Sequence, residues 1–198
     1  MKTTAKTTAR KSPKTTATRT AKKTTAPRKV ARPANLVRVS VERGAAAPGL
    51  ASAGLKKRAE RMLDALDLQG VEVSLALVGD PAIRRLNKQW RKKDETTDVL
   101  SFPMLDESSE PTPASTGLTL LGDVVVSTPT AARQAKARKA PLADEITILM
   151  AHGVLHLLGF DHGSDGDEAE MNAYARVLEA AASSRLPMRL KLVPVRPR

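Results

Sequence analysis

The chain has 198 residues, a formal net charge of +12 and no cysteine. This length allows one domain with a proper core, and the lack of thiols excludes disulfides, thiolate zinc sites and a cysteine nucleophile. No apolar run is long enough to span a membrane, and the absence of cysteine agrees with a reducing compartment, so we expect a cytoplasmic protein.

The positive charge is concentrated at the N-terminus. Residues 1–33 hold eleven Lys or Arg and no acid, which leaves 22 basic and 21 acidic residues for the rest of the chain. Because this segment has few large apolar residues and its like charges repel, we expect a disordered basic arm that binds nucleic acid through counterion release. A merely solvated extension and an organelle transit peptide are the alternatives. The folded domain would then be 34–186, followed by a basic tail at 187–198.

Strand and helix patterns alternate through this domain. Period-two alternation of apolar residues predicts strands, and apolar residues three or four apart predict helices. The expected fold is one α+β domain in which a small mixed sheet packs with helices. The expected elements are a strand at 35–41, a helix from Gly49 that ends before Gly70, a strand at 71–78, a helix from Asp80 through Trp90, a short strand running to Pro103, a surface loop at 106–117, a buried strand at 118–127, a basic helix from Thr128, an apolar helix from Pro141 through Leu158 and a final helix at 167–184.

Two helix ends carry local signals of their own. Asp80 followed by Pro81 predicts an N-cap and a first-turn proline. Gly159 follows the last apolar residue of the helix that begins at Pro141, which predicts a C-terminal stop at that glycine.

All three histidines of the chain lie in one stretch of eleven residues, HGVLHLLGFDH. On a helix, His152 and His156 lie on the same face about 6 Å apart, and the turn at Gly159 can bring His162 back toward them. Three imidazoles with an open fourth position are the ligand set of a catalytic zinc, which lowers the pKa of bound water to about 7. We therefore expect one Zn²⁺ at His152, His156 and His162. Ordinary structural histidines, or Ni, Fe or Mn as the metal, are the alternatives.

The residue after the first histidine separates this pattern from that of the zinc peptidases. Peptidases of the His-Glu-x-x-His type carry their catalytic Glu at that place, whereas this chain has Gly153. We expect Gly153 to leave room beside the ion. Metal chemistry is therefore predicted without the base that peptide hydrolysis uses.

Three blocks of sequence resemble the YbeY family of zinc-dependent endoribonucleases, the ribosomal RNA maturation factors. They are HGVLHLLGFDH, LNKQWRKKDETTDVLSFP at 86–103 and LGDVVVS at 121–127. The resemblance spans about residues 35–184. Phe160 and Trp90 stand where the family more often has Tyr, and neither is a proposed ligand.

The resemblance implies a fold, a ligand set and a substrate. It implies an α+β fold with zinc held by His152, His156 and His162. It also implies cleavage of single-stranded ribosomal RNA, in maturation of the small-subunit rRNA 3′ end and in ribosome quality control, with the small ribosomal subunit as a partner.

Residues for the remaining chemistry are less firmly indicated. Arg91 matches the family's Arg, and its guanidinium suits bidentate contact with phosphate, so we expect it to be the catalytic clamp on the transition state; a plain helix-surface Arg is the alternative. Asp161 could orient an imidazole or cap the turn. Asp98 and Asp123 could position a ligand or accept a proton, or they could cap or brace the sheet. None of them is assigned as the general base. The basic run 133–139 offers a second cationic face.

Three functions fit these patterns. The first is a metal-dependent endoribonuclease acting on single-stranded RNA in ribosomal RNA processing. The second is a non-catalytic ribosome-assembly factor whose zinc is structural and whose arm supplies affinity. The third is a metallopeptidase, against which Gly153 counts.

Overall fold

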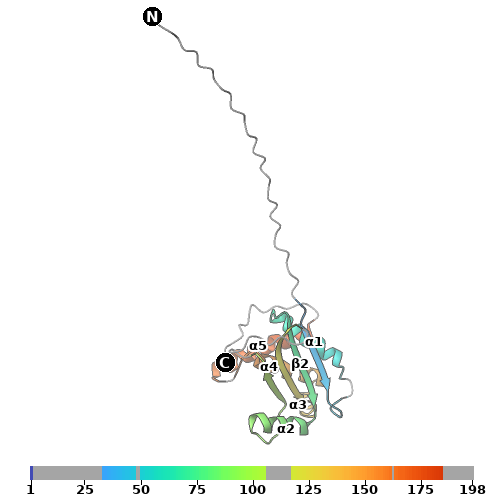
Figure 1. Ribbon diagram of the computed structural model, residues 1–198. Helices are drawn as coiled ribbons and strands as arrows, with labels where there is room; N and C mark the ends of the chain where they lie inside the picture. The colour runs from blue at the N-terminus through green and yellow to red at the C-terminus, as the bar shows by residue number, and fades with distance from the viewer. Residues whose placement is uncertain (2–32, 48–49, 106–116, 162, 185–198) are drawn as a thin grey trace. The chain divides into compact units, whose positions relative to one another are not determined.

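A computed structural model describes residue 1 and residues 33–47, 50–105, 117–161 and 163–184, and the predicted arm, surface loop and basic tail fall almost wholly outside them. Residues 1–31 group apart from residues 32–198, and the second unit holds the helices and strands (Figure 1). No helix among the described residues is both long and apolar enough to cross a membrane. The elements are β1 (Leu36–Val41), α1 (Ser52–Ala65), β2 (Val71–Val78), α2 (Asp80–Arg91), β3 (Val99–Pro103), β4 (Thr119–Ser127), α3 (Thr128–Arg138), α4 (Leu142–Leu157) and α5 (Asp165–Ser183).

The described strands form one mixed sheet in the order β1-β2-β4-β3. Strand β2 pairs in parallel with β1 and with β4, while β3 runs antiparallel to β4 at one edge. Helices follow β2 and β4 directly, as expected after parallel strands. The α+β class and the mixed sheet predicted from the sequence are confirmed.

Helices cover both faces of this sheet. Val124 and Val126 of β4 point into the main core, to which α1, α4 and α5 contribute. Val125, between them, packs with Ile83 of α2 and Leu100 of β3 in a second, smaller cluster. Because successive strand residues point to opposite faces, α2 and α4 lie on opposite sides of the sheet.

The sequence patterns located the elements well and misread one cap. Helix α1 begins at Ser52, three residues after Gly49. The N-cap of α2 is Gly79, and no side chain caps this helix, so the assignment of Asp80 as the N-cap was wrong. The Asp80 carboxylate instead accepts hydrogen bonds from Ser127, Thr130 and Arg133, which joins α2 to the start of α3.

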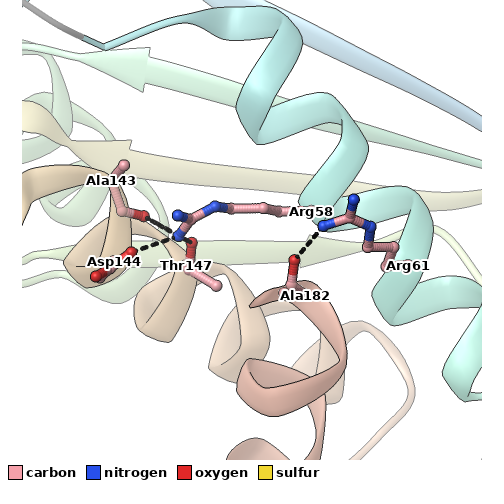
Figure 2. A network of polar contacts seen from close by, with 6 residues as sticks. All are labelled: Arg58, Arg61, Ala143, Asp144, Thr147 and Ala182. Carbon is pink, nitrogen blue, oxygen red and sulfur yellow. Dashed lines mark hydrogen bonds and ion pairs between the residues drawn. The ribbon is translucent and has the colours of Figure 1, made fainter. Parts of the chain in front are cut away.

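Polar side chains of α1 hold two of the helices on its side of the sheet. Figure 2 shows the guanidinium of Arg58 donating to the carbonyl of Ala143, the carboxylate of Asp144 and the hydroxyl of Thr147, at 2.7 to 3.1 Å. One turn later, Arg61 donates to the carbonyl of Ala182 on α5. Arg58 therefore fixes the first two turns of α4, the helix that carries two of the three histidines.

Candidate metal centre

The helix with the histidines is apolar along most of its length and has defined ends. Acidic residues lie in its first turn, where the helix dipole favours them. At the other end Gly159 adopts φ +86°, and its N–H donates to the carbonyl of His156. The N–H of Phe160 donates to the carbonyl of Leu155, which completes a Schellman motif. The predicted stop at Gly159 is confirmed, and it places His156 in the last turn of α4.

Backbone carbonyls set the orientation of both helical imidazoles. Nδ1 of His152 lies 3.1 Å from the carbonyl of Ile148, and Nδ1 of His156 lies 2.8 Å from the carbonyl of Phe160. A carbonyl can only accept, so in the neutral rings each Nδ1 carries the proton and each Nε2 carries the lone pair. This is how metal-binding histidines are commonly oriented, and both residues fit a zinc ion on this ground.

The third predicted ligand is His162. His162 lies outside the described residues, and among those that are described no group of three His, Asp or Glu is arranged to hold a metal. His162 thus stays a prediction. Asp161, next to it, is exposed and has a polar interaction, while its proposed role in orienting an imidazole stays untested.

Gly153 is needed for close packing between α4 and the sheet. A Cβ on this residue would lie 2.5 Å from Cγ1 of Val124 in β4. Gly122 of β4 makes the reciprocal contact, because its Cβ would lie 2.9 Å from Cδ2 of Leu157. The two glycines let helix and strand approach closely at neighbouring positions. Gly153 therefore faces the sheet, and the expectation that it leaves room beside the ion was wrong.

Arg91, the predicted phosphate clamp, is the exposed last residue of α2. The adjacent ring of Trp90 packs edge-on against Phe102 of β3, with centroids 5.9 Å apart. Ser101, the next residue along β3, donates from its hydroxyl to the carbonyl of Gly153 at 3.2 Å. Edge strand β3 thus lies between the end of α2 and the histidine helix. No contact between Arg91 and a histidine is found among the described residues, so its role stays a prediction.

The acids in the family-like blocks differ in their surroundings. Asp98 accepts from the N–H of Val99 and from the side-chain amide of Gln134 on α3, so it braces the junction of β3 and α3. Asp123 is half-buried on β4, paired with Phe102 across the strands. In the part of the chain that the structure describes, no hydrogen bond or ion pair joins Asp98 or Asp123 to His152 or His156.

Two acids of the helices that pack around α4 had no signal in the sequence. Burial raises the pKa of Glu179 on α5, while the charges of His152, Arg138 and Arg176 oppose that rise. Glu145 on α4 is fully buried, and its nearest recorded cation is Nε of Arg138 at 3.6 Å. Glu179 therefore interacts electrostatically with His152 and with Glu145, a property that emerges when α3, α4 and α5 pack together.

The aromatic residue after the stop glycine is part of the core. Phe160 is 2% exposed, and its ring packs edge-on against Tyr174 of α5 with centroids 5.3 Å apart. The contact ties the turn that follows α4 to α5. Phe in place of the family's commoner Tyr therefore keeps an anchor for the segment that leads to His162.

Comparison with protein families gives one clear match. The family model described as Endoribonuclease YbeY matches residues 47–181. Curated proteins with that name include one from Aquifex aeolicus, 47% identical over 114 residues that cover 58% of this chain and 71% of the relative. Another, from Persephonella marina, is 44% identical over 117 residues, 59% of this chain and 73% of the relative. A relative from Myxococcus xanthus is 53% identical over 108 residues, but these are 35% of its length.

A solved structure shares the fold. The solution structure of a protein from Thermotoga maritima matches with a TM-score of 0.51 and 25% sequence identity. The match covers 74% of this chain and 89% of the other. The arrangement of helices around a mixed sheet is thus found in an independently determined structure.

Proposed function

The chain belongs to the endoribonuclease YbeY family, and from this premise we propose that it is a metal-dependent endoribonuclease that cleaves single-stranded RNA during ribosomal RNA processing. The proposal extends to maturation of the small-subunit rRNA 3′ end and to ribosome quality control, in the cytoplasm and on the small ribosomal subunit. The observation that carries the metal part is the fixed orientation of two imidazoles, His152 and His156, by backbone carbonyls.

His152, His156 and His162 would hold one zinc ion. A zinc ion there would supply a Lewis acid that activates water and neutralises charge on a phosphoryl oxygen. The carbonyls of Ile148 and Phe160 keep each Nε2 available as a lone-pair donor by holding the proton on Nδ1. Zinc is the expected ion because imidazoles suit it and the chain has no thiol to offer a softer metal.

Arg91 is the proposed contact with the scissile phosphate. Its guanidinium stays protonated and can donate two parallel hydrogen bonds to phosphoryl oxygens as negative charge develops there. The position at the end of α2, separated from α4 by the edge strand β3, suits an RNA strand that passes around that edge. No side chain is assigned as the general base.

The packing of Gly153 argues against a metallopeptidase. Peptidases of the related spacing need a Glu at this position. Here any Cβ would meet Val124 at 2.5 Å, so a glutamate would force α4 away from the sheet. The close packing of α4 against β4 therefore leaves no space for a glutamate side chain at position 153.

Cleavage of a labelled single-stranded RNA by the full chain, after its bound metal is measured, tests the proposed activity. We expect His156→Ala to lose both metal and cleavage, and Arg91→Ala to keep the metal and lose about a hundredfold in kcat. Arg43→Ala, which removes an exposed arginine of the β1–α1 connection, is the matched control and should cleave normally. Metal binding without cleavage, or cleavage that survives both site changes, would favour the non-catalytic assembly factor with a structural zinc.

The basic arm has a separate test. We propose that residues 1–33 bind RNA through their charge, since they hold eleven basic residues and no acid. Removal of the arm should weaken RNA binding and flatten its dependence on salt. An unchanged salt slope would leave the arm without this role.

A further inference from the structure

The positive charge of the folded domain is concentrated on two helices. Residues 84–93, on α2 and just after it, hold six Lys or Arg and no acid, and residues 133–139, on α3 and just after it, hold four and no acid. By contrast, residues 165–179 of α5 hold five acids and one arginine. The nearly neutral net charge of the domain therefore hides a strong asymmetry between its helices.

Some of these cations form ion pairs within the fold, and others do not. Arg84 and Lys88 share the carboxylate of Asp94, and Arg133 pairs with Asp80. A second group of exposed cations has no ion pair with any residue in the described parts of the chain. We call this group the α2–α3 basic surface; it consists of Arg85, Lys92, Lys93, Lys136 and Lys139.

Two of its lysines occupy backbone positions that disfavour them. Lys92 and Lys139 follow the last residues of α2 and α3, with φ of +60° and +53°. Side chains are strained in this left-handed conformation, and glycine is the usual residue there. Asp67, after α1, is the third non-glycine residue of this kind among those described. Both basic helices thus keep a charged side chain where glycine would relieve strain.

Helix capping is a structural alternative for one of the two lysines. Nζ of Lys92 donates to the carbonyl of Gln89 at 2.9 Å, and a cation at a helix C-terminus interacts favourably with the dipole. No hydrogen bond of the Lys139 ammonium group to another described residue is recorded. Helix capping therefore does not explain why both Lys92 and Lys139 stand at these positions.

The two helices are joined to each other and to the histidine helix. Figure 1 shows α2 and α3 at one end of the sheet, where Asp80 of α2 accepts from Ser127, Thr130 and Arg133. Helix α3 packs against α4, and Nε of Arg138 lies 3.6 Å from Glu145 there. A hollow along α2 is lined by Arg84, Arg85 and Lys88 together with Asp80 and Asp94, and Asp94 pairs with Arg84 and Lys88, which leaves Arg85 as the lining cation without an ion pair among the described residues.

We propose that the α2–α3 basic surface binds the phosphate backbone of the RNA substrate outside the cleavage site, and that Lys92 and Lys139 are retained in a strained conformation for their charge. This rests on the proposed function, because it assumes an RNA substrate. Exposed cations without carboxylate partners bind a polyanion by releasing its counterions, without reading its bases. The surface therefore supplies affinity and direction to the strand but no sequence preference.

The test uses the full chain and glycine substitutions, which remove charge and relieve strain together. We expect Lys92→Gly with Lys139→Gly to keep or raise the melting temperature. The same pair should lower affinity for a 2′-O-methyl single-stranded RNA about tenfold at physiological salt, and its salt slope by about 1.4. In cleavage of unmodified RNA the loss should fall on KM, with kcat unchanged.

Two matched controls separate charge from strain. Asp67→Gly relieves the same conformation without removing positive charge, so it should leave RNA affinity unchanged. Lys57→Gln removes one exposed lysine from α1, away from the basic helices, and should change affinity less than Lys139→Gly does. An equal loss in Lys57→Gln would overturn the proposal, because any lysine would then serve.

The remaining outcomes distinguish this inference from the proposed function. If the unaltered chain binds and cleaves RNA while the paired glycine variant keeps its affinity and salt slope, the basic surface is overturned and the activity stands. A lower melting temperature with unchanged affinity would assign the lysines to helix capping and overturn it as well. If the unaltered chain neither binds nor cleaves RNA, both proposals fail.

Discussion

The two ends of helix α4 use their polar side chains in different ways. In the first two turns, Asp144 and Thr147 accept hydrogen bonds from Arg58, a side chain more than eighty residues away in sequence. At the last turns, the recorded Nδ1 bonds of His152 and His156 go to backbone carbonyls four residues away. Long-range side-chain partners fix where the helix lies, whereas local carbonyl partners fix how an imidazole points. One helix therefore combines an anchored end with an end whose side chains are oriented for a ligand.

Substitution of Gly153 should have the largest effect on stability, because it breaks the packing beneath the functional end. Glycine to alanine inside a helix is normally stabilising by about 1 kcal/mol. Here the new Cβ would lie 2.5 Å from Val124, so we expect Gly153→Ala to lower the free energy of unfolding by up to about 3 kcal/mol, measured by urea unfolding.

Two variants check the cause of that loss. Gly54→Ala in α1, where nothing lies within 4 Å of the new Cβ, should stabilise the protein. Shortening the opposing side chain in Gly153→Ala with Val124→Ala should recover part of the loss. If Gly153→Ala stabilises the protein as Gly54→Ala does, the close approach of α4 to β4 is wrong.

Replacement of Arg58 should have a smaller effect, confined to the anchored end. Arg58→Met removes three hydrogen bonds to the first two turns of α4, so we expect the free energy of unfolding to fall by about 2 kcal/mol. Cleavage at a temperature where the variant is folded should match that of the unaltered chain. Arg61→Met, which loses the hydrogen bond to the carbonyl of Ala182, should lower the free energy of unfolding by less. Loss of cleavage in folded Arg58→Met would show that the two ends are not separable.

The junction of α2 and α3 should give the smallest effect, and one that depends on pH. Burial favours a higher pKa for Asp80, but hydrogen bonds from Ser127, Arg133 and Thr130 outweigh it and hold the pKa below its usual value. The unfolded chain, with an Asp pKa of about 3.9, then binds more protons in the interval between the two pKa values. The stabilisation by Asp80 is therefore complete above that interval and is lost as pH falls through the folded pKa.

Urea unfolding across pH checks this sign. We expect Asp80→Asn to be less stable than the unaltered chain at neutral pH and the difference to close as the pH falls below about 3.9. A difference that stays constant with pH would mean that the charge of Asp80 contributes nothing at this junction.

Features with a local signal could be predicted from the sequence, and those that arise from long-range packing could not. Alternation located β2 at 71–78 and glycine located the end of α4 at Gly159, because each depends on neighbouring residues. The bonds of Arg58 to α4 join segments far apart in the chain and had no local pattern. The burial of Glu145 could not be predicted either, since charged residues are ordinarily exposed.

The candidate site divides along the same line. The spacing of His152 and His156 predicted a shared helix, and the structure adds which nitrogen of each ring carries the proton. The sequence indicated that Gly153 stands where a peptidase has Glu. The close contact with Val124 that requires a glycine there depends on how α4 packs against β4. Lys92 and Lys139 gave no signal, because a lysine in the sequence does not indicate a left-handed backbone.

The functional end of α4 is proposed to offer two Nε2 lone pairs to a metal ion. Long-range ¹H–¹⁵N NMR of the full chain, with and without zinc at a pH where the rings are neutral, measures this directly. We predict that in the metal-free protein His152 and His156 are protonated on Nδ1, and that zinc shifts both Nε2 resonances. Protonation on Nε2 in either ring, or Nε2 resonances that do not move when zinc is added, would contradict it.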